Sequence, residues 1–121
     1  MTMSKKVIEN DLGDITIEQE VIAEHAGMAA LDCFGIVGMA IMNVTDGIVY
    51  LLKKESANKG VRVVMKDDML YIEMHIIVAY GVNITTVTEN LINAVTYNIE
   101  HNLGIKVNRI VVCVDNVRVI D

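Results

Sequence analysis

The clearest pattern in the chain is the alternation of apolar side chains in residues 69–80, MLYIEMHIIVAY. Every second residue, starting at Leu70, is apolar, whereas Glu73 and His75 occupy intervening positions. A period of two residues is typical of a β-strand that buries one face. We therefore predict a strand whose outer face is half polar. The predicted core face consists of Leu70, Ile72, Met74, Ile76, Val78 and Tyr80.

A second strand precedes this one and is predicted to pair with it as a hairpin. Residues 61–66 are rich in β-forming side chains, and Asp67 and Asp68 separate them from the next strand. Two such residues between apolar runs are typical of a tight turn. The middle of a strand near the C-terminus, residues 110–114, is apolar on both faces, which predicts a central strand or an outer face covered by a partner. In all, the further predicted strands are residues 14–16, 37–44 and 106–119.

Two longer segments carry apolar residues with the helical period of about 3.6 residues. The first runs from Thr16, at the start of a capping box, to Cys33. The second follows Asn83 or Thr85, either of which can cap it, and ends before Gly104. A glycine in this place is typical of a helix that terminates in the left-handed conformation.

A shorter helix is predicted for residues 45–56, TDGIVYLLKKES, because Ile48, Leu51 and Leu52 fall on one side of it. Two lysines near its end suit the negative pole of a helix. The predicted order is therefore β-α-β-α-β-β-α-β. This order indicates an α+β fold, a two-layer sandwich with a mixed β-sheet and helices on one face. The other face of the sheet has no predicted helix to cover it.

Length and composition predict one domain with surplus apolar surface. The chain has 121 residues, so we expect a single domain. We place this domain at residues 13–121, after a ragged N-terminus at residues 1–12. Apolar residues make up 53% of the sequence, and the mean hydropathy is +0.43. A domain of this size cannot hide so much apolar surface in its own core, so we expect an interface, most simply a homo-oligomer.

The longest apolar run, residues 34–42, is far shorter than the roughly 20 residues of a membrane-spanning helix. No secretory signal precedes it, so we expect a cytoplasmic protein. The net charge of −6 disfavours nucleic acid as a partner, because affinity for phosphate backbones comes largely from Lys and Arg. It also disfavours direct contact with an anionic membrane.

No set of residues in the sequence predicts an active site or a cofactor. Gly35 and Gly38 form a Gly-x-x-Gly loop, but its apolar filler and its lack of nearby Lys or Arg disfavour a phosphate clamp. Cys33 lies on a predicted apolar helix face, a poor setting for a thiolate. Glu73 and His75 share one strand face, but two ligands do not make a metal site. We therefore predict no catalytic, cofactor-binding or metal-ligating residues, and no enzyme.

The uncovered sheet face is the best candidate for a site of contact with other proteins. Its residues come from the strand of residues 69–80 and, if the last strand shares this face, from residues 106–119. The predicted interface consists of Tyr71, Glu73, His75, Ile77, Val111 and Cys113.

The sequence resembles a known family along most of its length, from about Gly13 to Val119. The resemblance lies in GDITIEQEVIAEHAGMAALDCFGIVGM, in VRVVMKDDMLYIEMHIIVAYGVNI, and most of all in YGVNITTVTENLINAVTYNIEHNLGIKVNRIVVCV. These segments resemble the alkaline shock protein family of Gram-positive bacteria, also called general-stress or envelope stress response proteins. The resemblance implies a cytoplasmic, non-enzymatic, self-associating protein. In some members a membrane-embedded protein partner holds the protein near the membrane, and some are encoded beside a kinase.

Two hypotheses follow from the residues and the resemblance together. The first is a self-associating scaffold that acts through protein–protein contacts near the cell envelope. The second is a regulatory or carrier module that binds an apolar ligand, such as an acyl chain, beside a kinase partner. This second hypothesis rests on the eight methionines of the chain, since the methionine side chain adapts to flexible ligands. Methionine is also a common filler of ordinary cores, which favours the scaffold.

Overall fold

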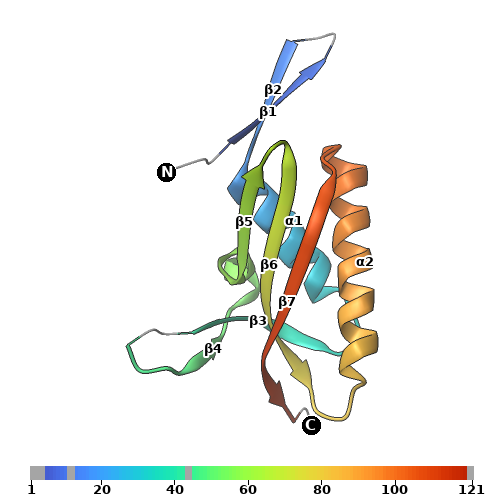
Figure 1. The fold of residues 1–121 in the computed structure, drawn as a ribbon. Coiled ribbons are helices and arrows are strands. Elements are labelled where there is room, and N and C mark those ends of the chain that lie inside the picture. The colour runs from blue at the N-terminus through green and yellow to red at the C-terminus, as the bar shows by residue number, and fades with distance from the viewer. Residues whose placement is uncertain (1–4, 11–12, 43–44, 120–121) are drawn as a thin grey trace.

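The computed structural model describes residues 5–10, 13–42 and 45–119. Its main sheet is centred on strand β6 (Met69–Ala79), with which three other strands pair. Along one edge β6 pairs antiparallel with β5 (Val61–Lys66) in its first half and with β3 (Ile36–Met42) in its second half. Along its other edge it pairs parallel with β7 (Val107–Arg118). Strand β4 (Val49–Leu51) extends the sheet beyond β3 (Figure 1).

The two long helices lie on the same face of this five-stranded mixed sheet. Figure 1 shows α1 (Gln19–Leu31) behind β5 and β6, and α2 (Ile84–Leu103) behind β7. Between the helices and the sheet lies one apolar core, to which β6 contributes its whole predicted inner face up to Val78. The predicted α+β class, with two layers and helices on one face, is confirmed. The largest fully buried side chains of this core include Ile22, Met39, Leu70, Met74, Ile76, Leu91 and Ile99.

Local sequence signals position the hairpin and the second helix as predicted. Asp67 and Asp68 have φ values of 52° and 63°, as a two-residue turn that follows the twist of the strands requires. Asn83 caps α2, because its side chain accepts a hydrogen bond of 3.0 Å from the backbone N–H of Thr86. Gly104 ends the helix in the left-handed conformation, with φ of 69°.

Residues 45–56 do not form the predicted α-helix. Val49–Leu51 form β4, which pairs with β3, and a 3₁₀ helix, η1 (Lys54–Gly60), begins only afterwards. The β-branched and aromatic side chains of β4 favour a strand once a neighbouring edge is present. The apolar spacing of a single short segment does not distinguish the two structures.

Three further details differ from the sequence-based expectation. Tyr80, predicted in the core, is 75% exposed, because β6 ends at Ala79 and the chain turns there. Part of the segment predicted to be ragged forms β1 (Lys5–Asn10), which pairs with β2 (Gly13–Glu18) as a separate two-stranded sheet. Among the described strands, β7 pairs only with β6 and is therefore an edge strand, so the first predicted alternative, a central strand, is wrong, and the second, an outer face covered by a partner, stays a prediction.

The Gly-x-x-Gly loop turns the chain and packs it against α2. Gly35 has a φ of +89°, and its carbonyl accepts a hydrogen bond of 2.9 Å from the N–H of Ala79. A Cβ atom at this position would lie 2.8 Å from Cγ2 of Val87 in α2. Both the backbone conformation and the packing therefore require glycine here.

Replacing Gly35 with alanine tests this packing role, and Gly47 provides a matched control. Gly47 also has a positive φ, of 70°, but a Cβ atom there meets nothing within 4 Å. We expect Gly47→Ala to lower the free energy of unfolding by about 1 kcal/mol. Gly35→Ala should lower it by about 2–4 kcal/mol, because the clash with Val87 adds to the backbone strain. Urea denaturation followed by circular dichroism measures both values, and equal losses would contradict a tight contact at Gly35.

Candidate functional site on the open face of the sheet

The sheet surface opposite the helices, here called the open face, is formed by β5, β6 and β7. The parallel register places Arg109 opposite Tyr71, Val111 opposite Glu73, and Cys113 opposite His75. These pairs alternate with the pairs that face the core, so the last strand shares the outer face of β6 as the prediction required. The open face is formed by Arg62 and Val64 of β5, Tyr71, Glu73 and His75 of β6, and Arg109, Val111, Cys113 and Asp115 of β7.

A β-bulge in β7 lies beside His75. The ladder pairs Ile76 with Val114 and then Ile77 with Asn116, so Asp115 is the extra residue. Such a residue locally bends the strand and redirects a side chain. The carboxylate of Asp115 accepts a hydrogen bond from Nδ1 of His75, with its two oxygens 3.0 and 3.2 Å from that nitrogen. The bulge therefore lies where β7 supplies a partly buried acceptor to β6.

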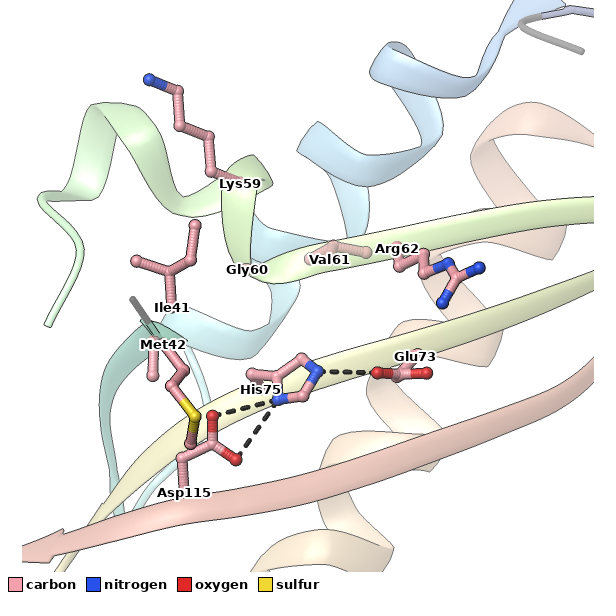
Figure 2. Close-up of a pocket in the computed structure, with 10 residues that line it drawn as sticks. Ile41, Met42, Lys59, Gly60, Val61, Arg62, Glu73, His75 and Asp115 are labelled. Atoms are coloured by element: carbon pink, nitrogen blue, oxygen red, sulfur yellow. Dashed lines mark hydrogen bonds and ion pairs between the residues drawn. The ribbon is translucent and has the colours of Figure 1, made fainter. Parts of the chain in front are cut away.

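His75 also contacts a second carboxylate, that of Glu73. Its Nε2 atom lies 2.7 Å from Oε2 of Glu73, and both residues come from β6 with one residue between them. Figure 2 shows the imidazole held between the two carboxylates. The exposed fraction of the side chain is 12% for Asp115 and 40% for Glu73. The ring thus has one mostly covered acidic partner, Asp115, and one more accessible acidic partner, Glu73.

This arrangement favours the protonated imidazole. Burial lowers the pKa of His75, but the hydrogen bond to Glu73 and the negative charge of Asp115 outweigh burial and leave the pKa above its usual value. A histidine whose pKa is higher in the folded chain stabilises the fold most below the pKa of the unfolded chain. This contribution is lost as the pH rises through the raised value.

Cys113 places a sulfur atom beside the same histidine. Its Sγ, a side-chain nitrogen of His75 and a carboxylate oxygen of Glu73 all lie within 4.8 Å of one another. Burial raises the pKa of the Cys113 thiol, and the negative charges of Glu73 and Asp115 raise it further. A thiol with a raised pKa is a poor nucleophile at neutral pH, so the cluster does not have the chemistry of a cysteine hydrolase.

Two hollows open on this face. One, of about 370 Å³, lies over His75, Glu73 and Asp115 and is bordered by the end of β3 and the start of β5 (Figure 2). The other, of about 130 Å³, has an apolar floor between two arginines. It is lined by Arg62, Val64, Tyr71, Ile72, Glu73, Arg109 and Val111. The open face therefore combines a polar cluster, formed by Glu73, His75 and Asp115, with an apolar patch, formed by Val64, Tyr71 and Val111.

One predicted interface residue, Ile77, is fully buried within the chain itself. It faces away from the helices but pairs with Gly38, where a Cβ atom would lie 2.7 Å from Cδ1 of Leu51. The β3–β4 hairpin therefore covers this end of the open face. Tyr71, Glu73, His75, Val111 and Cys113 lie on the open face as predicted, and their role in an interface stays a prediction.

Sequence reasoning missed Asp115, the most buried member of the polar cluster. The alternation that begins at Arg109 and continues through Val111 and Cys113 would have placed Asp115 on the same face.

The other two histidines lie apart from the site. His25 of α1 contacts the side-chain oxygen of Asn98 in α2 at 3.2 Å, and His101 stacks on Tyr97.

Comparison with known proteins identifies the family. Residues 7–119 match the alkaline shock protein 23 family, described as having a cell envelope-related function. The chain belongs to this family. It is 43% identical over 108 residues to the uncharacterized protein YloU of Bacillus subtilis strain 168, covering 88% of this chain and 90% of that protein.

Two further relatives are similar over most of their length, and both are also named as uncharacterized. Spy1614 of Streptococcus pyogenes serotype M6 is 34% identical over 119 residues, which cover 98% of each chain. YqhY of Bacillus subtilis strain 168 is 29% identical over 102 residues, which cover 84% of this chain and 75% of that protein. No solved structure matched the chain. Among the described residues, no helix is both long enough and apolar enough to cross a membrane.

The different burial of the two carboxylates gives a prediction for stability. In metal-free buffer at pH 6, we expect Asp115→Ala to lower the free energy of unfolding by about 1–3 kcal/mol, because it leaves a half-buried charged imidazole without its less exposed acceptor. Glu73→Ala should cost about 1 kcal/mol or less, because water replaces an accessible carboxylate. Urea denaturation measures both, and a larger loss for Glu73→Ala would show that burial does not rank the two contacts.

Proposed function

We propose that this protein is a non-enzymatic scaffold that associates with copies of itself through the open face and acts near the cell envelope. The observation that carries the proposal is the apolar patch on that face. Val64 and Val111 are 41% and 40% exposed, and they flank the half-buried ring of Tyr71 around the smaller hollow. An apolar sheet face without a covering layer is a common site of protein–protein contact.

The charges around the patch favour a second copy as the partner. Arg62, Arg109 and Glu73 all line the hollow around the patch, and Arg62 lies directly opposite Glu73 in the strand register. In a two-fold symmetric interface each surface meets itself, so an arginine of one copy can face Glu73 of its partner. A surface that carries both signs of charge around an apolar centre is therefore self-complementary.

Proximity to the cell envelope is inferred from the family, whose description links it to the envelope. We infer that the protein acts in the cytoplasm and reaches the membrane through a membrane-embedded protein partner. The scaffold role agrees with the cluster around His75, where the pKa of the Cys113 thiol is raised instead of lowered. A site that uses cysteine as a nucleophile requires the opposite shift.

Charged substitutions in the patch test self-association. We expect the double variant Val64→Lys with Val111→Lys to weaken self-association at least about tenfold, because docking then buries unpaired like charges. Met28→Lys is the matched control, since Met28 is a similarly exposed apolar residue on α1, in the other layer. Light scattering coupled to size-exclusion chromatography measures the mass over a range of concentrations.

The outcomes of this experiment are distinct. A wild-type chain that stays monomeric at high concentration overturns the proposal, and so does a double variant that associates as strongly as the wild type. Circular dichroism of the double variant checks that its fold is intact. If Met28→Lys alone abolishes association, the contact lies on the helical layer instead.

The carrier hypothesis, with an apolar ligand beside a kinase partner, receives less support. Met39 and Met74 are fully buried among the side chains of the core, where they act as ordinary packing. Native mass spectrometry of the purified protein separates the two hypotheses. An oligomer without ligand supports the scaffold, and a co-purifying lipid supports the carrier.

A further inference from the structure

We propose that Glu73, His75 and Cys113 bind a zinc ion on the open face, and that Asp115 acts as a positioning residue for His75. The ligands would be a carboxylate oxygen, Nε2 of the imidazole and the thiolate sulfur. The proposal does not depend on self-association, because all four residues belong to one chain. It departs from the sequence analysis, which found only two of the three ligands on one strand and therefore predicted no metal site.

The three donor atoms already lie close to the positions that the ion requires. A ring nitrogen of His75, the sulfur of Cys113 and a carboxylate oxygen of Glu73 lie within 4.8 Å of one another, and Nε2 is the ring nitrogen that faces Glu73. Tetrahedral zinc has bonds of about 2.0–2.3 Å, which place neighbouring donor atoms about 3.3–3.6 Å apart. Binding therefore needs movements of about 1 Å, and the accessible side chain of Glu73 has room to make them. Because β6 and β7 are paired in register at His75 and Cys113, the backbone need not move.

The contact between His75 and Asp115 prepares the imidazole for a metal. Nδ1 donates to a carboxylate that is nearly buried, so the neutral ring carries its proton on Nδ1 and presents the lone pair of Nε2. A carboxylate on the far nitrogen is the usual partner of a zinc-bound histidine. Nε2 now lies 2.7 Å from Oε2 of Glu73, and the ion would take the place of the proton between these two atoms.

The charge of the donor set matches a divalent cation. On binding, the Cys113 thiol and the protonated imidazole each release a proton to solvent, which leaves a thiolate, a neutral ring and the Glu73 carboxylate. Their combined charge of −2 balances Zn²⁺, and Asp115 adds a further negative charge nearby. A sulfur and a nitrogen ligand favour zinc over magnesium or calcium, which prefer oxygen.

Space for a fourth ligand is present above the cluster. The hollow of about 370 Å³ borders both His75 and Glu73, so a water molecule can complete the tetrahedron. Lys59 and Arg62 also line this hollow, but Figure 2 shows the ammonium group of Lys59 directed away from His75. The fourth position is thus accessible from solvent.

Cobalt binding tests the site with a built-in control. The full chain, reduced and stripped of metal by a chelator, is titrated with Co²⁺, whose bond to a thiolate gives a charge-transfer band in the near ultraviolet. We expect one Co²⁺ per chain, displaced by Zn²⁺, and loss of the band in Cys113→Ser. Cys33→Ser should keep the band, because Cys33 packs against the core on the helical side. Asp115→Asn should keep it with about 10–100-fold weaker affinity.

A second measurement uses the unmodified chain and so does not depend on how a variant folds. Alkylation of the two cysteines is followed by peptide mass spectrometry with and without Zn²⁺. We expect Zn²⁺ to slow alkylation of Cys113 at least tenfold while Cys33 reacts at an unchanged rate, and a chelator to reverse the protection. Equal rates with and without Zn²⁺, the absence of stoichiometric Co²⁺ binding, or a band that survives Cys113→Ser would overturn the proposal.

Discussion

The pairing of β6 with β7 is the constraint on which both the core and the open face depend. Parallel strands cannot be joined by a tight turn, so the chain must cross over one face of the sheet between them. Here α2 makes that crossover, and it lies on the same face as α1. The core therefore forms on one side only. The other side presents β5, β6 and β7, except at the end that the β3–β4 hairpin covers.

The same pairing determines which side chains meet on the open face. Because β6 and β7 run in the same direction, His75 lies opposite Cys113, and Glu73 lies opposite Val111. The bulge after Val114 then keeps Asp115 beside the imidazole. A slip of one residue in this register would turn the polar side chains toward the core, where an unpaired charge is very costly. The apolar inner face of β6 therefore also fixes the geometry of the polar cluster.

The sequence predicted the elements that depend on local chemistry. The hairpin turn at Asp67 and Asp68, the cap at Asn83 and the terminal Gly104 each follow from backbone preferences of one or two residues. Residues 49–51 were predicted wrongly because their strand forms only when the edge of β3 is present. Such a tertiary contact leaves no trace in the spacing of a short segment.

The site was predicted only in part for the same reason. Alternation within β6 placed Glu73 and His75 on one face, and this needs no knowledge of the fold. That Cys113 would lie opposite His75 depends on how two strands separated in sequence by the whole of α2 align, which no local pattern encodes. Ile77 shows the converse, because alternation predicted its face but not the β3–β4 hairpin that covers it.

Zinc at the proposed site would make the proposed interface less costly to form. Glu73 and Asp115 together carry more negative charge than one imidazolium balances, and Glu73 lies beside the apolar patch. Covering that patch with a second copy removes water from these carboxylates, which is costly unless their charge is paired. A bound divalent cation supplies that pairing within one chain. Metal binding would therefore reduce the desolvation cost of docking.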